Sequence, residues 1–427
     1  MQAQSYSRQL EPVVAELMQA FRIVYLSGPR QSGKTTLARQ IGQQLGLRYF
    51  SLDDQALLSA VRNDPHGFIH STKGQPIILD EFQYVPELIP AIKQASDNLK
   101  MGEKGRFLLT GSADIFRSAR TQEALPGHMA RLELYPLSIA EISSSRRNLV
   151  DCLIAGDFRS AAEPSWSRET IAQRILVGGY PETQQMSMRA RDIWFQSYLE
   201  GRLFKDFESL HSARGDYYSK LRALSSYLAG LSSGLLKYAT LAKDLQIDDR
   251  LARRYIDVLE WLYIVKRLPA YRKNRGKRIA TGMPKLHLVD TGLACHLLRV
   301  NSPDQLLHSG HYGALLESLV YSELIKHATH ASRPCDLFHF RDTNQREVNL
   351  VLEHSGTKII GIEVKASSTL RADDFRHLSR LAELLGDDFD RGVIIYTGDK
   401  VLPFRFGQHR FLALPISIFG NGSAVQQ

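Results

Sequence analysis

Cysteine is scarce in this chain. Its 427 residues include only three, Cys152, Cys295 and Cys335. They are widely separated and form neither a CxxC pair nor an even disulfide framework. We expect all three to be reduced and buried, as in a cytoplasmic protein.

Long apolar runs are missing as well. No stretch approaches the roughly 18 to 20 apolar residues needed to cross a bilayer. The first residues, MQAQSYSRQLEPVVAEL, lack the basic and then apolar plan of a secretory signal and favour a short amphipathic helix. The chain is 43 % hydrophobic and 23 % charged, which is typical of globular proteins. We expect a soluble, cytoplasmic protein without a membrane partner.

Acidic residues are fewer than basic ones, which leaves a formal net charge of +9 and a pI near 9.3. A basic balance favours a polyanionic partner, either nucleic acid or an anionic membrane surface, although many basic proteins have neither. The chain is long enough for two to four domains of about 100 to 200 residues each.

The first 145 residues have an α/β pattern. Four short apolar or β-branched runs each end at a Gly, an acidic residue or a Ser: residues 21–28, 47–53, 76–81 and 106–112. Helix-like stretches separate them, for example residues 34–45 and 86–99. Strands that alternate with helices predict a parallel sheet covered on both faces, with ligands at the carboxyl ends of the strands.

The segment GPRQSGKTT, at the end of the first predicted strand, matches the phosphate-loop pattern G-x-x-x-x-G-K-[ST]. Glycines let such a loop wrap around phosphate oxygens, and its amides and the following helix N-terminus donate hydrogen bonds. Lys34 would supply positive charge and Thr35 would bind magnesium. The predicted cofactors are ATP and Mg²⁺. The predicted nucleotide contacts are Gly28, Pro29, Arg30, Gln31, Ser32, Gly33, Lys34, Thr35 and Thr36.

The acidic pair Asp80 and Glu81 ends the predicted strand PIILDE. Such a strand end delivers one carboxylate to magnesium and leaves the next to orient the attacking water. The adjacent strand ends at Thr110 and Ser112, which either sense the terminal phosphate or form an ordinary turn. ATP cleavage also needs an arginine against the developing charge. Arg117, Arg120 and Arg131 are candidates that the sequence does not rank.

Further segments follow in order: ILDEFQYVPEL, LLTGSA, LELYPLSIAEI, GGYPE and PKLHLVDTGLACHLL. Together with the phosphate loop they resemble a prokaryotic family of AAA-type ATPases with a winged-helix segment and a C-terminal endonuclease-like domain. The resemblance covers nearly the whole chain. It implies a P-loop ATPase core over residues 1–145, a helical lid over 146–210, a winged helix over 211–305 and an endonuclease-like α/β domain over 306–427.

The resemblance also implies residue roles. Gly28, Gly33, Lys34 and Thr35 would hold phosphate and magnesium, Asp80 and Glu81 would serve hydrolysis, Ser112 would be the sensor, and Gly179 and Pro181 would lie near the adenine. One stretch departs from the family. Similar proteins carry L-x-G-R after the sensor strand, whereas this chain has Leu125-Pro-Gly-His128. Histidine, with an unperturbed pKa of about 6.5, is a poor substitute for that arginine at neutral pH. Arg131, one helical turn further on, is the candidate to compensate.

Residues 238–268 predict a short helix, a turn and a longer helix, and the following basic stretch predicts a two-stranded wing. Between residues 250 and 278, only Asp257 and Glu260 oppose the positive charges. The predicted DNA contacts are Arg250, Arg253, Arg254, Arg272, Lys273, Arg275, Lys277 and Arg278. They would meet phosphates, so that binding would depend on salt and only weakly on sequence. The alternative is a protein-docking or oligomerisation module.

After about residue 312 a predicted helix precedes four strand-like runs, DLFHFR, EVNLVLE, KIIGIEVK and RGVIIYTG. Their order is that of a PD-(D/E)xK nuclease core with Glu317, Glu363 and Lys365. Asn349 stands where such domains place aspartate, and an amide is a weak ligand for a hard dication. Glu347 is on the same strand face, but its length and register argue against it as a substitute. The sequence therefore predicts a degenerate nuclease site, with a buried acid paired with a neighbouring base as the alternative for Glu317.

Taken together, these features predict an AAA-type ATPase that remodels or translocates duplex or junction DNA. We expect it to act as a homo-oligomer, for which a hexameric ring is one arrangement. Two other classes remain: a nucleotide-controlled signalling or scaffold switch, and an active metal-dependent nuclease.

Overall fold

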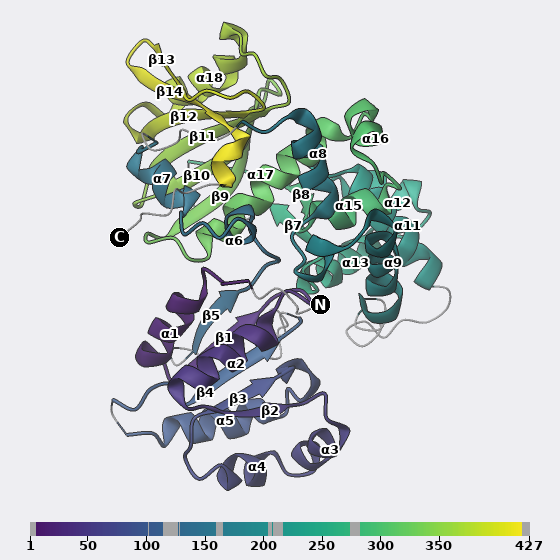
Figure 1. Cartoon of the computed structure of the whole chain (residues 1–427), viewed down its shortest axis with the longest axis vertical. Coiled ribbons are helices and arrows are strands. Elements are labelled where there is room, and N and C mark those ends of the chain that lie inside the picture. Colours follow the sequence, from purple (N-terminus) through teal and green to yellow (C-terminus); the bar gives the residue numbers. More distant parts are fainter. Residues whose placement is uncertain are drawn as a thin grey trace. The chain divides into compact units, whose positions relative to one another are not determined.

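The computed structural model describes residues 6–100, 102–113, 127, 129–158, 165–203, 207, 217–273 and 282–420. The chain divides into two compact units (Figure 1). The first unit contains residues 7–136 together with Trp261–Tyr263, and the second contains the remaining described residues. Arg117, Arg120, Leu125, Pro126, His128, Arg275, Lys277 and Arg278 lie outside the described residues.

The first unit is built on a five-stranded parallel sheet in the order β2-β3-β4-β1-β5. The strands are β1 (Ile23–Ser27), β2 (Arg48–Ser51), β3 (Ile77–Asp80), β4 (Phe107–Gly111) and β5 (Met129–Glu133). The helices are α1 (Glu11–Ala20), α2 (Lys34–Leu45), α3 (Gln55–Asn63), α4 (Pro65–Ser71) and α5 (Leu88–Asp97), with a 3-10 turn η1 (Phe82–Tyr84). The four predicted strands and the helix over 34–45 are confirmed.

Alternate residues of the central strands enter two different cores, as the period of two in a strand requires. Ile23 and Tyr25 of β1 join a cluster with residues of α3, α4 and α5. Val24 and Leu26, which point the other way, join a cluster with residues of α1 and α2. Both faces of the sheet are thus covered, as the alternating pattern predicts, and the strand ends are left as the open edge.

Strand β5 was not expected from the sequence. Arg131 lies in its middle, opposite Tyr25 of β1, and is exposed. The helical spacing assumed for Arg131 is therefore wrong, because Met129–Glu133 extends the sheet beside β1.

The second unit begins with a mostly helical part, as predicted. Its helices are α6 (Ile139–Ile142), α7 (Leu149–Ala155), α8 (Arg168–Val177), η3 (Glu182–Gln185), α9 (Met188–Tyr198), η4 (Leu199–Leu203), α11 (Tyr217–Gly230), α12 (Tyr238–Asp244), α13 (Asp249–Trp261), α15 (Thr291–Leu297) and α16 (Pro303–His308). Three short strands, β6 (Gly234–Leu235), β7 (Val265–Leu268) and β8 (Lys285–Leu288), form an antiparallel sheet in the order β6-β8-β7.

The predicted short helix, turn and longer helix are α12 and α13. The strand that pairs with β8 is β7, which precedes the basic stretch predicted to form both strands of the wing, and residues 274–281 of that stretch lie outside the described residues. The elements α11, β6, α12, α13, β7 and β8 follow one another along the chain, and the assignment of this stretch as a winged helix stays a prediction. We call this stretch the α11–β8 segment.

The rest of the second unit is a six-stranded sheet in the order β13-β14-β12-β11-β10-β9. Its strands are β9 (Cys335–Arg341), β10 (Glu347–His354), β11 (Lys358–Lys365), β12 (Phe389–Tyr396), β13 (Leu402–Phe406) and β14 (His409–Pro415). The helices are α17 (Tyr312–Ala328) and α18 (Arg376–Leu385), with the 3-10 turns η5 (Ala372–Phe375), η6 (Gly386–Asp388) and η7 (Ile416–Phe419). The predicted strands β9 to β12 are confirmed, whereas α18, β13 and β14 were not expected.

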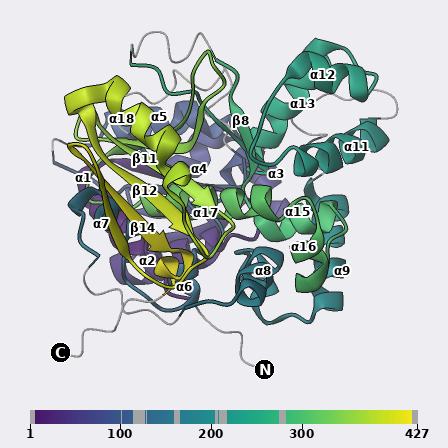
Figure 2. The same cartoon turned by 90° about the horizontal axis from the view of Figure 1, so that it is seen from above.

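Helices α17 and α18 lie on opposite faces of this sheet (Figure 2). Val348 of β10 packs in the core with Leu378 of α18. The next residue, Asn349, points the other way and donates a hydrogen bond to Glu317 of α17. The face turned toward α17 therefore carries the predicted nuclease residues, while the opposite face is an apolar core.

The three cysteines are free thiols. Cys295 is buried, but Cys152 and Cys335 are only partly buried, so the expected burial is right for Cys295 alone. Of the helices within the described ranges, none is long and apolar enough to span a membrane.

Helix α18 offers a test of the core that holds β10 and β11 in place. Leu378 is fully buried and Leu384 is 55 % exposed on the same helix. We expect Leu378→Ala to lower the free energy of unfolding by about 2–5 kcal/mol, because it leaves a cavity. The matched change Leu384→Ala should alter it by less than about 0.5 kcal/mol. Urea unfolding followed by circular dichroism measures both, and equal effects of the two changes would contradict the packing described.

Candidate functional site

The phosphate loop joins β1 to α2, and its shape depends on glycine. Gly28 has φ 151°, and a Cβ atom there would lie 2.1 Å from the carbonyl oxygen of Leu134. Gly33, at the N-terminus of α2, has φ 96°. Both positions exclude side chains, for steric reasons at Gly28 and for conformational reasons at both. The spacing of glycines in the motif thus has a direct structural cause.

Lys34 points back into this loop. Its ammonium donates to the carbonyl oxygens of Gly28 at 2.9 Å and Pro29 at 2.7 Å, and the side chain is nearly buried. The predicted contacts from Gly28 to Thr36 occupy the loop and the first turn of α2. A fixed positive charge and the N-terminus of a 12-residue helix together favour bound phosphate.

Asp80 is held by three hydroxyl groups. Thr35 Oγ1 donates to Asp80 Oδ2 at 2.9 Å, Tyr49 Oη donates to the same oxygen at 2.7 Å, and Thr110 Oγ1 donates to Asp80 Oδ1. Burial raises the pKa of Tyr49, and hydrogen bonding to Asp80 adds to the effect, so Tyr49 remains a protonated donor. The predicted partners Thr35 and Asp80 are therefore adjacent, although they are 45 positions apart in sequence.

The Thr35 and Asp80 oxygens fit a magnesium ion. Magnesium prefers oxygen ligands at about 2.0–2.1 Å in octahedral geometry, so neighbouring ligands lie about 2.9 Å apart. The Thr35 Oγ1 to Asp80 Oδ2 distance is 2.9 Å. Thr35 and Asp80 are the residues of this chain that would hold the ion.

Glu81 has the left-handed backbone conformation, with φ 57°. Gln83, which was not singled out in the sequence, donates through Nε2 to Glu81 Oε2 and, at 2.8 Å, to Ser112 Oγ. The Ser112 amide donates back to Gln83 Oε1 at 3.2 Å. An uncommon backbone conformation held in place by neighbouring contacts is frequent at functional sites. Glu81 and Ser112 are thus coupled through one amide side chain.

Two further residues outside the motif fix the loop. Arg8, which is buried, donates to the carbonyl oxygens of Ser32 at 2.6 Å and Tyr135 at 2.7 Å. Tyr263 donates to Ser27 Oγ at 2.6 Å, directly before Gly28. Both contacts connect positions far apart in the chain, and neither residue lies in a recognisable pattern, so sequence reasoning had no signal for them.

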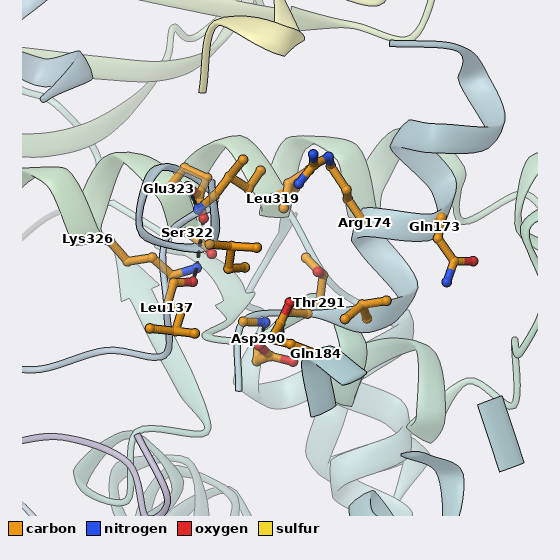
Figure 3. A pocket seen from close by; sticks show the side chains of 15 residues that line it. Leu137, Gln173, Arg174, Gln184, Asp290, Thr291, Leu319, Ser322, Glu323 and Lys326 are labelled. Carbon is orange, nitrogen blue, oxygen red and sulfur yellow. Dashed lines mark hydrogen bonds and ion pairs between the residues drawn. The ribbon is translucent and has the colours of Figure 1, made fainter. Parts of the chain in front are cut away.

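Gly179 and Pro181, the expected adenine contacts, lie in the second unit. Gly179 lines a cavity of about 250 Å³, together with residues of α6, α8, α15 and α17 (Figure 3). Its amide donates to the buried Asp290 at 2.7 Å. Nearby, Lys326 is bonded to Glu323 at 2.8 Å and to the Leu137 carbonyl at 3.0 Å. The nucleotide role of Gly179 and Pro181 stays a prediction.

The described members of the predicted DNA-binding set are all exposed: Arg250, Arg253, Arg254, Arg272 and Lys273. Arg253 pairs with Asp249 at 3.1 Å, and Lys273 pairs with Asp388 at 3.1 Å. Arg250 and Arg254, four apart on α13, take part in no ion pair among the described residues. The two opposing acids, Asp257 and Glu260, are both engaged by Arg267. Arg250 and Arg254 are therefore exposed positive charges on α13 that no described acid pairs with.

The predicted nuclease residues Glu317, Glu347 and Asn349 lie together, but they surround a lysine. Lys285 Nζ, on β8, lies 2.6 Å from Glu317 Oε1 and 2.5 Å from Glu347 Oε1. The alternative interpretation of Glu317, a buried acid paired with a base, is the observed one. No group of three or more His, Cys, Asp or Glu side chains in the described part of the chain is arranged to hold a metal ion. These residues do not fit a divalent metal as they stand.

Arg8 provides a test of how the phosphate loop is held. Arg8→Ala should lower the free energy of unfolding by about 1–3 kcal/mol, because two carbonyl groups lose a charged donor. It should also weaken nucleotide binding, since Ser32 lies within the loop. Thermal unfolding and calorimetric titration with a nonhydrolysable ATP analogue measure both effects. Arg48→Ala, which removes an equal charge from an exposed site in the same unit, is the control, and an Arg8 variant that behaves like it would rule out this role.

Three family models match separate parts of the chain: an AAA domain over residues 20–143, and two domains of unknown function over residues 168–304 and 312–419. Uncharacterized proteins of Mycobacterium bovis and Mycobacterium tuberculosis are each 28 % identical over 381 residues, which cover 89 % of this chain and 78 % of each relative.

Solved structures of low similarity include the Walker-type ATPase of Pyrococcus abyssi, at 14 % identity and a TM-score of 0.41 over 69 % of this chain and 96 % of that one. Another is the Thermotoga maritima RuvB Holliday junction branch migration motor, at 14 % identity and a TM-score of 0.30 over 62 % of this chain and 90 % of that one.

The match to the AAA family model contains the phosphate loop, Asp80, Glu81 and Ser112, which the structure gathers at one edge of a parallel sheet. Residues 20–143 therefore form an AAA domain with a phosphate loop, and the two other matched domains are of unknown function.

Proposed function

We propose that the chain hydrolyses ATP with the aid of magnesium and uses this turnover to remodel or translocate duplex or junction DNA as a homo-oligomeric ring. The observation that carries the hydrolysis is the contact of Thr35 with Asp80 at 2.9 Å beside the phosphate loop. Magnesium, when bound, neutralises charge on the phosphates. Every other contribution comes from the side chains of the chain itself.

Each of these side chains has a distinct role in hydrolysis. Lys34 balances phosphate charge, and Glu81 accepts a hydrogen bond from the attacking water and orients it. Ser112, linked to Glu81 through Gln83, senses whether the terminal phosphate is present. Arg131, exposed on the edge strand β5, is a candidate to act on the site of a neighbouring subunit.

Binding of DNA is supported by the α11–β8 segment. Arg250 and Arg254 are spaced four residues apart on the exposed face of α13, where they would meet two phosphates of a backbone. Duplex or four-way DNA should therefore bind in a salt-dependent way and stimulate ATP hydrolysis. A motor would release its product and cycle repeatedly, whereas a nucleotide-controlled switch would hold its nucleotide. Comparing the rate of a single turnover with the steady-state rate of ATP hydrolysis distinguishes the two.

Glu81→Gln tests the hydrolytic site. The change keeps the shape of the side chain but removes the charge that orients the water, so turnover should fall by about 10²- to 10⁴-fold with ATP affinity retained. Lys34→Ala should instead weaken nucleotide binding. Phosphate release and calorimetry measure the two effects, with exposed Glu87→Gln as the control. Undiminished turnover in Glu81→Gln would refute the role assigned to that residue.

Arg250→Ala/Arg254→Ala tests the DNA surface. Loss of two phosphate contacts should reduce the slope of log K against log salt by about 2, without changing sequence preference. The control is Arg376→Ala/Arg380→Ala on α18, which removes the same charge from two residues already paired with acids. Fluorescence anisotropy with duplex and four-way DNA at several salt concentrations measures the slopes. If the α18 double variant weakens binding as much as the α13 one, the α11–β8 segment is not the DNA-binding surface.

A further inference from the structure

The carboxylates expected to hold a catalytic metal in the C-terminal domain converge instead on an ammonium group. Lys285 begins β8 and is 1 % exposed. Its Nζ lies 2.6 Å from Glu317 Oε1, on α17, and 2.5 Å from Glu347 Oε1, on β10. Carboxylates gathered in a buried place need a compensating cation. Here the compensating cation is the ammonium group of Lys285.

The remaining oxygens of the two carboxylates are also engaged. Glu317 Oε2 accepts a hydrogen bond from Asn349 Nδ2 at 2.7 Å, and Glu347 Oε2 pairs with Arg341 at 3.1 Å. Asn349 Oδ1 in turn accepts from the Val364 amide at 2.9 Å. An aspartate at position 349 could not donate to Glu317 and would add a third negative charge. The asparagine therefore suits a cluster closed around Lys285.

The charges agree with this arrangement. Burial by itself lowers the pKa of Lys285, but the adjacent Glu317 and Glu347 outweigh burial, and the pKa lies above its ordinary value. Burial raises the pKa of Glu363, the acid of the E-x-K pair, to about 8. Lys365, the other half of the E-x-K pair, is bound to Asp374 at 3.3 Å.

Lys285 also connects two parts of the second unit. It belongs to the α11–β8 segment, whereas its partners belong to the C-terminal sheet and to α17. Backbone hydrogen bonds join the same parts: the His339 amide donates to the Pro269 carbonyl at 3.0 Å, and the Tyr271 amide donates to the His339 carbonyl at 2.6 Å. Lys285, Glu317 and Glu347 thus lie where the α11–β8 segment meets the C-terminal sheet, and backbone hydrogen bonds hold these two parts side by side.

We propose that the Lys285 ammonium permanently takes the place of a divalent metal ion between Glu317 and Glu347, so that the C-terminal domain is a metal-independent anchor for the α11–β8 segment. The domain then contributes no metal-dependent cleavage of DNA. Its task in this molecule is to hold helix α13 and the strands that follow it on a rigid base. This inference does not depend on ATP hydrolysis.

The test is to remove the ammonium and offer a metal ion. In an Asp80→Asn background, which disables the magnesium position of the ATPase domain, nucleotide-free protein is titrated with Mn²⁺ and followed by electron paramagnetic resonance and by the thermal midpoint. The Lys285 parent should bind no Mn²⁺ at this cluster. The apparent affinity of Lys285→Ala for Mn²⁺ should exceed that of the Lys285 parent by at least about tenfold, equivalent to about 1.4 kcal/mol. The thermal midpoint of Lys285→Ala should also rise when Mn²⁺ is added.

Three matched variants show whether the gained ion uses the same carboxylates. Lys285→Arg keeps the charge and should gain no Mn²⁺ binding. Lys285→Ala/Glu317→Gln should lose the gain, because one of the two carboxylates is neutralised. Lys285→Ala/Asn349→Asp should bind more tightly than Lys285→Ala, since it adds a charged ligand.

Two outcomes would overturn the proposal. One is a parent protein that already binds Mn²⁺ and loses it on Glu317→Gln. The other is a Lys285→Ala chain that gains no Mn²⁺ binding, whether it is folded or unfolded. If Lys285→Ala is unfolded alone but folds when Mn²⁺ is added, while Lys285→Arg folds without it, the exchange of ammonium for metal is supported directly.

Discussion

The alignment of β3, β4 and β1 as neighbouring parallel strands is the constraint on which the nucleotide site depends. Parallel strands end at the same edge, so the phosphate loop after β1, Asp80 after β3 and Thr110 at the end of β4 meet there. Hydroxyl groups then set the orientation of the carboxylate. Thr35 and Thr110 bind the two different oxygens of Asp80. The chemistry of the site therefore follows from strand order and from a small number of short side chains.

In the second unit, buried carboxylates are neutralised by a lysine of the same chain. In the first unit Asp80, at the end of β3, lies beside a loop whose shape and charge suit phosphate and an ion. In the C-terminal sheet the comparable acids are closed around Lys285, and their remaining oxygens are taken by Asn349 and Arg341. A closed cluster stabilises one arrangement of the α11–β8 segment, whereas an open one would leave carboxylates to be balanced from solution. Asp80 in the first unit is thus bonded to hydroxyl groups beside the phosphate loop, whereas Glu317 and Glu347 in the second unit are paired with a lysine.

The sequence predicts local features well where a residue type has one main structural use. The glycines at positions 28 and 33, the helix that starts at Lys34 and the strand that ends at Asp80 are of this kind. The apolar alternation also predicts β9 to β12. Contacts between distant positions leave no such trace. Arg8 bonding to Ser32, Gln83 bonding to Ser112 and Lys285 bonding to Glu317 each require knowledge of which elements meet. Strand β5 was not predicted because its segment, MARLE, mixes exposed and buried positions at the edge of the sheet.

Trp261–Tyr263 belong to the first unit, although the residues on either side belong to the second. Tyr263 is buried there with φ 60°, its ring lies edge-on to Tyr135 with centroids 6.1 Å apart, and its hydroxyl reaches Ser27. The first unit is consequently not one continuous length of polypeptide. A fragment that stops at residue 145 would therefore lack part of the interior of this unit.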